Sequence, residues 1–236
     1  MNEQEKSTEL SLPVIGLNDR VAVFGGTGSG KSILAQVLYR SLPKEWHKII
    51  VDTTDSVIEP SALDFYDPEN IPWDKAWNLR FVPDIELLDE EVNTLYTNAF
   101  YHGACFIWLD EGNEVSTAHR TVPGLRRVLL QGRKAMVGHL TCTPRPADIS
   151  VSITSQSQYI IVFSLVNYDD RVRVAKNIGL QIDEFDEYMS QLEEYQYLFY
   201  DVAMHDLYKC EAIPSDIVDK ILNPRKKEGT VEYAHP

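Results

Sequence analysis

The sequence predicts a doubly wound α/β domain in which a mainly parallel sheet is flanked by helices. Three observations support this fold class. Short apolar runs alternate with segments of helical periodicity, which is the order that βαβ units require. A glycine-rich loop joins the first apolar run to a helix, and a later run ends on two adjacent acids, Asp110 and Glu111.

The composition is that of an ordinary globular protein. The 236 residues are 44% hydrophobic and 25% charged. We expect one domain over residues 14–222, with a flexible polar leader at 1–13 and a polar tail at 223–236. No apolar stretch approaches the roughly 20 residues of a membrane-spanning helix, and the N-terminus is acidic rather than basic and then apolar, as in a signal peptide. We therefore expect a cytoplasmic protein without a membrane span.

Strands are expected at short apolar runs. Residues 104–109 are continuously apolar, which suits a central parallel strand that is covered on both faces. Residues 196–202 are expected to form an edge strand. The complete set of expected strands is 20–24, 48–52, 79–82, 104–109, 137–142, 158–165 and 196–202.

Helices are expected where apolar residues recur three and four positions apart, as Val92, Leu95, Tyr96 and Ala99 do. The Pro- and Asp-rich stretch 60–77 is expected to be a surface excursion. The complete set of expected helices is 33–42, 89–102, 123–134 and 215–222.

The glycine-rich loop has the pattern of a phosphate-binding loop. Its glycines allow backbone angles at which successive N–H groups point inward around phosphates, and the following helix presents its positive end to the same anion. We expect Lys31 to reach the β- and γ-phosphates of ATP and Ser32 to supply a hydroxyl to Mg²⁺. The alternative is a glycine-rich turn with an incidental lysine. The expected binding residues are Gly25, Gly26, Thr27, Gly28, Ser29, Gly30, Lys31, Ser32 and Ile33.

The adjacent acids predict hydrolysis. Asp110 ends a buried strand, where ligands collect in open α/β sheets, and is the expected Mg²⁺ partner. Glu111 is the expected catalytic residue that polarises a water for attack on the γ-phosphate; the alternative is that it only caps the following turn. Together with the loop, these acids predict a P-loop NTPase of the RecA-like (ASCE) class that converts ATP and water to ADP and phosphate.

The segment 124–149 resembles the FtsK/HerA superfamily of DNA-pumping ATPases. Members run from the acidic strand through a helix that ends in Gly-Arg-Lys, here residues 132–134, to a strand that ends in Thr-Gln-Arg-Pro, here Thr-Pro-Arg-Pro at 143–146. The resemblance covers roughly residues 18–180. It implies a ring, commonly a hexamer, that threads double-stranded DNA. The short chain is most similar to the genome-packaging ATPases of viruses.

That resemblance implies partners and alternatives. The expected partners are the backbone of double-stranded DNA, without sequence preference, other copies of the chain in a homo-hexameric ring, and capsid or virion membrane proteins; the expected location is the host cytoplasm or the virion. A HerA-like repair translocase and a conjugation-type motor remain alternatives. From other classes, a small-molecule or nucleoside kinase and a nucleotide-dependent assembly switch also remain open.

Two catalytic assignments follow from the resemblance. Pro144 stands where the family has a glutamine that senses the γ-phosphate, so Thr143 or Thr141 is expected to take this role. Thr143 is favoured because it lies nearest the ligand edge of the sheet. Arg133, in the Gly-Arg-Lys position, resembles an arginine supplied across a subunit interface. Arg126 and Arg127 are rival candidates, and Arg133 could instead be an ordinary solvated arginine at a helix end.

Charge is distributed unevenly along the chain. The net charge of -14 excludes a protein that simply coats nucleic acid, but residues 115–147 contain no Asp or Glu. We expect Arg120 to lie nearest DNA; the alternative is that the whole basic stretch serves phosphate sites between subunits. Its basic residues are Arg120, Arg126, Arg127, Arg133, Lys134 and Arg145.

Overall fold

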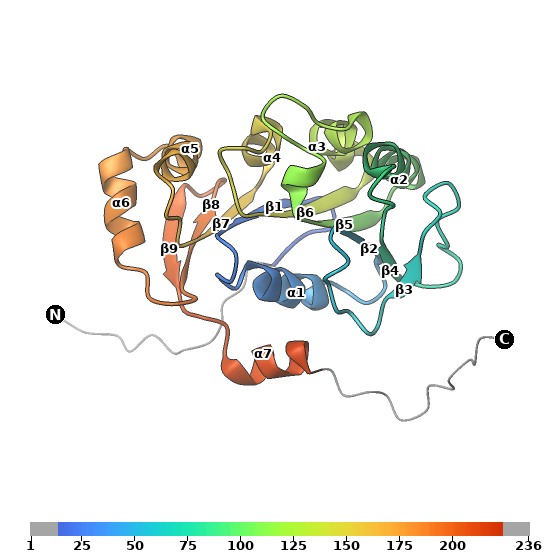
Figure 1. The fold of residues 1–236 in the computed structure, drawn as a ribbon, viewed down its shortest axis with the longest axis horizontal. Helices are drawn as coiled ribbons and strands as arrows, with labels where there is room; N and C mark the ends of the chain where they lie inside the picture. The colour runs from blue at the N-terminus through green and yellow to red at the C-terminus, as the bar shows by residue number, and fades with distance from the viewer. Residues whose placement is uncertain (1–13, 224–236) are drawn as a thin grey trace.

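The computed structural model describes residues 14–223, in which nine strands form one sheet (Figure 1). The leader expected at residues 1–13 and the tail from residue 224 onward lie outside the described residues. The order of strands across the sheet is β3-β4-β2-β5-β6-β1-β7-β8-β9. Neighbours from β3 to β7 pair in parallel, whereas β8 and β9 are antiparallel. The strands are β1 Arg20–Phe24, β2 His47–Asp52, β3 Leu63–Phe65, β4 Asn78–Phe81, β5 Cys105–Asp110, β6 Val137–Thr143, β7 Tyr159–Phe163, β8 Tyr197–Asp201 and β9 Asp206–Cys210.

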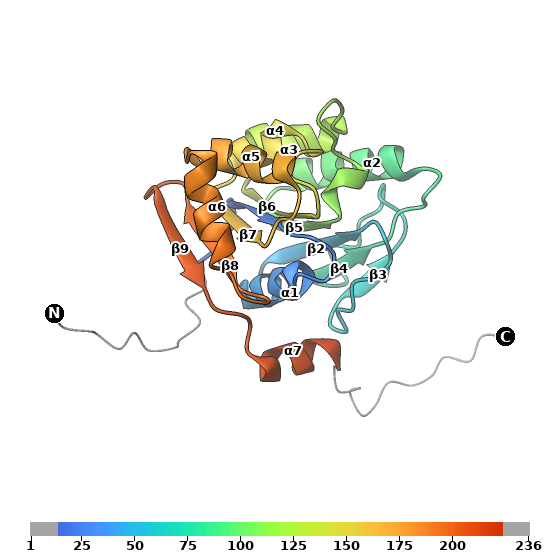
Figure 2. The same ribbon diagram turned by 60° about the vertical axis from the view of Figure 1, so that its left-hand side comes forward.

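Helices cover both faces of the sheet. Figures 1 and 2 show α1 on one face, α2 to α5 on the other, and α7 on the outer side of α1. A short 3-10 turn, η1, follows β5 directly. The helices are α1 Lys31–Ser41, α2 Leu88–His102, η1 Gly112–Glu114, α3 Pro123–Ala135, α4 Val151–Gln156, α5 Tyr168–Ile178, α6 Ile182–Ser190 and α7 Ser215–Leu222.

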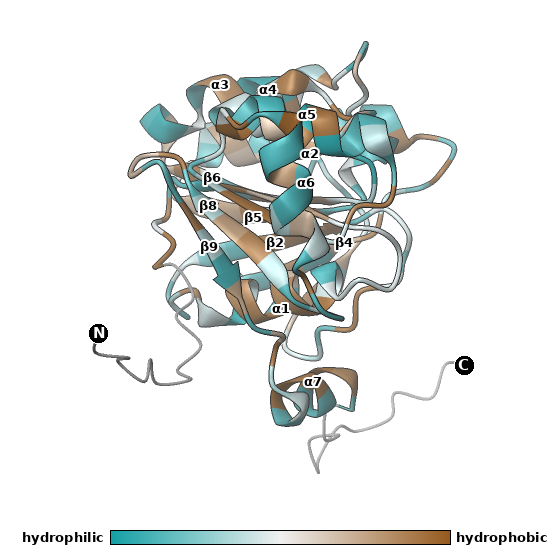
Figure 3. Cartoon of the chain, turned by 90° about the vertical axis from the view of Figure 1, so that its left-hand side faces the viewer, coloured by the Kyte–Doolittle hydropathy of each residue, from teal (hydrophilic) through white to brown (hydrophobic). Residues whose placement is uncertain are grey.

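Strand β5 shows how the sheet separates two hydrophobic cores. All six of its residues are buried. Because side chains alternate along a strand, Phe106 and Trp108 pack with α1, whereas Ile107 and Leu109 pack with α2 and α3. Figure 3 shows the sheet between helices in which hydrophobic and hydrophilic residues alternate. The sheet is therefore a rigid base for the loops at its edges.

The predicted fold class is confirmed, and all the expected strands and helices are present within a few residues of their predicted bounds. The prediction missed β3, α4, α5, α6 and β9. The assignment of residues 196–202 to an edge strand was wrong, because β9 pairs with the outer side of β8. None of the helices within residues 14–223 is long and apolar enough to cross a bilayer.

The position of β6 determines where the functional residues gather. It lies between β1, which leads into the phosphate loop, and β5, which leads into the acidic pair. Since the three strands are parallel, their carboxyl ends lie at one edge of the sheet. The loop, Asp110 with Glu111, and Thr143 are thus brought to the same edge from three separate parts of the sequence.

Candidate active site

The phosphate loop has the backbone that its glycines predict. Gly28 and Gly30 have φ values of 79° and 98°, in the left-handed region that favours glycine. Gly30 is the residue before the first turn of α1, and Leu34 N–H donates to its carbonyl. A side chain at Gly25 has no room, because a Cβ there would lie 2.5 Å from Ser29 Oγ and 2.7 Å from Phe163 Cβ. Gly30 offers no side chain to cap the first N–H groups of α1, and such a helix N-terminus favours an anion.

Lys31 and Glu111 meet at this site. Lys31 Nζ lies 3.3 Å from Glu111 Oε1, with the lysine side chain 6% exposed and the glutamate 24% exposed. Glu111 adopts a left-handed backbone (φ 50°, ψ 57°), which is uncommon for a residue with a side chain. The two predicted catalytic residues are therefore in contact, and the sharp turn after β5 is what directs Glu111 toward the lysine.

Asp110 is buried beside them. Burial raises the pKa of its carboxyl to about 7, with further raising by Glu111 and Asp52 and an opposing effect of Lys31. Its Oδ1 atom is buried and has no hydrogen-bond partner among the described residues. Both features describe a carboxylate whose negative charge the protein alone does not compensate.

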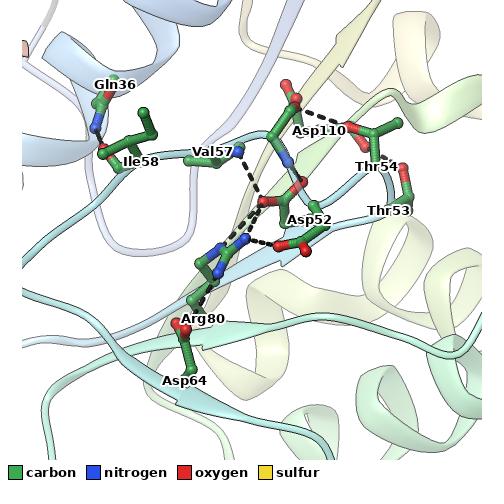
Figure 4. Close-up of polar contacts among 11 residues, drawn as sticks. Gln36, Asp52, Thr53, Thr54, Val57, Ile58, Asp64, Arg80 and Asp110 are labelled. Carbon is green, nitrogen blue, oxygen red and sulfur yellow. Dashed lines mark hydrogen bonds and ion pairs between the residues drawn. The ribbon is translucent and has the colours of Figure 1, made fainter. Parts of the chain in front are cut away.

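A second acid, Asp52, stands next to Asp110 and was missed by the prediction (Figure 4). The two residues are register partners at the ends of β2 and β5. Asp52 accepts hydrogen bonds from Val57 N at 2.8 Å and from Arg80 Nε at 3.0 Å. Arg80 also pairs with Asp55 and Asp64. Asp52 is thus compensated in place, whereas Asp110 is the acid left available for a ligand.

The sensor candidates differ in their surroundings. The carbonyl of Thr143 accepts from Gly25 N at 3.4 Å, and its hydroxyl donates to Asn113 Oδ1 at 3.1 Å. Thr141 Oγ1 instead lies 2.9 Å from His139 Nδ1 in the core. Thr143 therefore touches the phosphate loop through its backbone and the turn after Glu111 through its side chain. Asn113 had not been predicted to take part.

Arg133 lies far from this edge. It is exposed in the last turn of α3, and it borders a hollow together with Arg20, the first residue of β1. Its charge helps to lower the pKa of Arg20, after the larger effect of burial. Arg133 is therefore at the amino ends of the strands and cannot reach the phosphate loop of its own chain.

The rival arginines lie on the surface of α3. Arg127 donates to Tyr101 Oη at 3.0 Å and stacks over the rings of Phe100 and Tyr101. Arg126 is exposed, and neither residue is near the Lys31–Glu111 pair in the contacts that the structure describes. Among these arginines, Arg127 already has partners within the chain.

The basic stretch does not form one positive patch. Arg120 forms a two-pronged ion pair with Asp89, with its Nη2 atom 2.8 Å from Oδ1. Arg145 donates to Asp170 Oδ2 at 2.9 Å, and Asp170 is buried. The absence of acids between residues 115 and 147 holds in sequence only, because α2 and α5 supply acids in space.

A family model, described as the central domain of helicase HerA, matches residues 4–55. This segment includes the phosphate loop and agrees with the resemblance predicted from the motifs. No curated protein matches the sequence.

Several solved structures share the fold. The genome packaging NTPase B204 from Sulfolobus turreted icosahedral virus 2, in complex with AMPPCP, matches with a TM-score of 0.69 and 21% identity, over 84% of this chain and 100% of that one. VirB4 of Thermoanaerobacter pseudethanolicus matches with a TM-score of 0.56 and 10% identity, over 84% and 90%. The pCW3 conjugation coupling protein TcpA, with ATPgS, matches with a TM-score of 0.55 and 14% identity, over 93% and 73%. The fold is that of these P-loop NTPases.

Proposed function

We propose that the chain is an ATP-hydrolysing motor that translocates double-stranded DNA and packages a viral genome into a capsid. The observation that carries the enzymatic part is the meeting of Lys31 and Glu111, 3.3 Å apart, beside the buried Asp110 at one edge of the sheet. Hydrolysis requires a lysine on the phosphates and a carboxylate close enough to orient the attacking water, and a phosphate-binding turn alone does not need that carboxylate.

In this proposal the loop holds the triphosphate. Gly25 N and Ser29 N donate to the carbonyls of Thr143 and Gly26, so the remaining N–H groups of the loop and those at the start of α1 surround the phosphates. Lys31 compensates the charge of the β- and γ-phosphates. A bound triphosphate competes with Glu111 for Lys31. Phosphate binding thereby frees the glutamate for the attacking water.

The residues present fit Mg²⁺. Asp110 Oδ1 is a buried oxygen without a protein partner, and Ser32 supplies an exposed hydroxyl at the start of α1. Carboxylate and hydroxyl oxygens are the ligands this hard cation takes. When bound, Mg²⁺ neutralises the charge that develops on the phosphate oxygens. Asp52 stays paired to Arg80 and holds the neighbouring strand end in place.

Glu111 then accepts a proton from a water molecule. The water oxygen bonds to the γ-phosphorus, the bond from that phosphorus to the β–γ bridging oxygen breaks, and ADP and phosphate leave. Thr143 and Asn113 connect the phosphate loop to the turn that carries Glu111. We assign Thr143 the sensing role on this basis, since Thr141 is committed to His139 in the core.

Arg133 completes the site of a neighbouring copy in the proposal. A head-to-tail ring places the face of one subunit against a different face of the next. Because Arg133 lies at the edge opposite its own loop, such a ring is the arrangement that can bring it to a phosphate. A homo-hexamer is our proposed assembly.

The DNA-translocating task is supported by the names of the similar proteins. B204 is described as a genome packaging NTPase, and the family model is that of helicase HerA. The conjugation coupling protein TcpA shares the fold with a lower TM-score, so a conjugation-type motor is the second candidate. Capsid or virion membrane proteins are proposed as partners, in the host cytoplasm or the virion.

The test is ATP hydrolysis with and without duplex DNA, combined with negative-stain imaging. We expect DNA to stimulate hydrolysis by the wild-type chain, no hydrolysis by Lys31→Ala, and rings with a duplex-sized hole in the presence of ATP. If the chain hydrolysed ATP but showed neither stimulation by DNA nor rings, the ATPase part of the proposal would stand and the DNA-translocating part would be rejected. Phosphoryl transfer to a small molecule in place of water would support the kinase alternative.

A further inference from the structure

A cavity adjoins the phosphate loop, and Glu111 is not among the residues that line it. Its volume is about 390 Å³, and Gly28, Gly30 and residues 31–33 form one side of it. The other walls come from distant segments of the chain. They are Phe163, Tyr195, Ile213, Val218 and Leu222.

One wall is aromatic and close to the loop. A Cβ on Gly30 would lie 3.4 Å from Tyr195 Cδ1 and 3.5 Å from Phe163 Cε1. Phe163 is buried at the end of β7, whereas Tyr195 is half exposed just before β8. Tyr195 adopts a left-handed backbone with φ 63°, a strained conformation for a residue with a side chain. That conformation holds a flat, accessible ring beside the phosphate loop.

Another wall is the C-terminal helix, α7. Helix α7 contacts α1, with Ile221 buried, and lies on its outer side (Figure 3). Val218 is partly exposed and Leu222 is exposed, and both line the cavity. The cavity is thus a slot lined by an aromatic ring and by an aliphatic helix face.

We propose that this slot binds the base of the nucleotide whose phosphates the loop holds, and that it discriminates only weakly between adenine and guanine. The inference rests on the proposed function, because a base can occupy the slot only when the loop holds the triphosphate of the same nucleotide. A purine is a flat aromatic ring whose two faces can stack on apolar groups, and its attachment to the phosphates requires a site that continues from the loop. The slot continues from Gly28 and Gly30 and has a flat ring on one wall.

The weak discrimination follows from the lining. Lys31 and Ser32 are assigned to phosphate and Mg²⁺, and the remaining wall side chains are apolar except for the Tyr195 hydroxyl. Adenine and guanine differ in the hydrogen-bonding groups on their edges. A site rejects an analogue by a factor of roughly 10⁴ or more when its own buried polar groups would lose their partners, whereas an apolar pocket discriminates by about 10² or less. Stacking accepts either base because each has a π-face.

The experiment compares steady-state hydrolysis of ATP and GTP, with inorganic tripolyphosphate as a competitor that lacks a base. For the wild-type chain we expect kcat/KM values for ATP and GTP within about 10²-fold of each other. Tyr195→Ala should raise KM for both about 10-fold with kcat retained, because one stacking wall is lost. Tyr195→Phe should keep the wild-type KM because the ring is retained. Leu222→Asp should raise KM, because it places a charge in the aliphatic wall of the slot. Inhibition by tripolyphosphate should stay unchanged in all three variants.

Tyr208→Ala is the matched control, since Tyr208 is an equally exposed tyrosine on β9 that does not line the slot. Unchanged KM values in both Tyr195→Ala and Leu222→Asp would overturn the base site and leave the proposed function intact. A preference for ATP above about 10⁴-fold would overturn the weak discrimination. Failure of the proposed function is distinct, since it would appear as wild-type hydrolysis, or as wild-type inhibition by tripolyphosphate, in Lys31→Ala.

Discussion

The two edges of the central strands are built differently. At the carboxyl edge, Glu111 has a left-handed backbone, and Asp110 Oδ1 and Ser29 Oγ are buried without partners among the described residues. At the amino edge, Arg133 is exposed at the end of α3, beside Arg20, whose Nε atom is also buried without a partner among the described residues. Ala104 and Met136, just before β5 and β6, have left-handed backbones there as well. Unpaired atoms and strained backbone, which each cost about 1–3 kcal/mol, therefore occur at both edges, and the difference lies in the charges: the carboxyl edge holds the acids Asp110 and Glu111 next to Lys31, whereas the amino edge carries two arginines. The chain therefore carries most of a phosphate site at one edge, whereas Arg133 at the other edge cannot reach that site within the same chain.

The largest expected effect tests whether these two edges work together. Arg133→Ala should lower DNA-stimulated ATP hydrolysis by about 10³- to 10⁵-fold, the range for an arginine that stabilises the transition state from a neighbouring subunit. The fold should be retained, because the side chain is exposed. Turnover is measured by phosphate release, and the Tm confirms folding.

Mixed rings distinguish action between subunits from action within one. Arg133→Ala and Glu111→Gln subunits are each inactive in the proposal, yet a mixed ring contains interfaces where an intact Glu111 faces an intact Arg133. Activity should reappear in mixtures. If every mixture stayed inactive, Arg133 would be an ordinary solvated residue, and the same experiment on Arg126→Ala and Arg127→Ala would follow. Lys134→Ala is the matched control at the same helix end.

The next largest effect concerns the carboxyl edge alone. Glu111→Gln should lower turnover about 10²- to 10⁴-fold, the range for loss of a general base. Binding of ATP should be retained or tightened, because the change removes a negative charge 3.3 Å from Lys31. Single-turnover hydrolysis and nucleotide binding separate the two effects. Glu114→Gln, in the same turn but exposed, is the control, and unchanged turnover in Glu111→Gln would make Glu111 a turn residue.

The sequence predicted the parts of the site that are contiguous. The loop and the acidic pair are local patterns whose positions follow from strands that end beside them, so Lys31, Asp110 and Glu111 could be placed together. The sequence could not assign Asn113, Asp52 and Tyr195 to the site, because their roles depend on contacts between segments that are far apart in the chain. Thr143 meets Asn113 only because β6 pairs with β5.

The missed elements have physical reasons. Helix α4 has six residues, several of them β-branched or hydroxylic, which are poor helix formers. Strand β9 is exposed at the sheet edge and has no apolar run. Helix α5 could have been found, because Asn167 caps it, Asp169 and Asp170 lie in its first turn and Gly179 ends it in a left-handed conformation. The prediction of a continuous positive charge over residues 115–147 was wrong in space. Sequence spacing does not show that Asp89 and Asp170 form ion pairs with the arginines of this stretch.

A smaller effect concerns the stability cost of Asp110. Its pKa is raised to about 7 in the folded protein, above the ordinary value of 3.8, so the folded state binds more protons than the unfolded state between these pH values. Stability therefore falls as pH rises from about 4 to 7, and the loss is complete above pH 7. In the absence of nucleotide and Mg²⁺, Asp110→Asn should raise the Tm at pH 8 by roughly 5–10 °C, corresponding to a few kcal/mol.

The same variant should gain much less at pH 5, where the wild-type carboxyl is already neutral. Thermal unfolding at pH 5, 6, 7 and 8 measures the difference. Asp74→Asn, an exposed acid, is the control and should show no such trend. A Tm difference that is independent of pH would show that the pKa of Asp110 is not raised.

The smallest expected effect concerns Arg120, which would sharpen the comparison by adding a DNA-facing surface to the two edges. Arg120 and Asp89 are both about half exposed and form a surface ion pair, which contributes only about 0–1 kcal/mol to stability. Either residue can therefore be replaced without unfolding the chain. If Arg120 contacts a DNA phosphate, Asp89 competes with that phosphate.

Arg120→Ala should then weaken duplex binding a few-fold regardless of sequence and reduce the slope of log affinity against log salt by about 1. Asp89→Asn should strengthen binding, because it frees the arginine. Lys220→Ala removes a positive charge from another exposed ion pair and should change neither quantity. Anisotropy of a labelled duplex at several salt concentrations measures all three, and equal affinities in Arg120→Ala and wild type would place the DNA-binding surface on a different part of the chain.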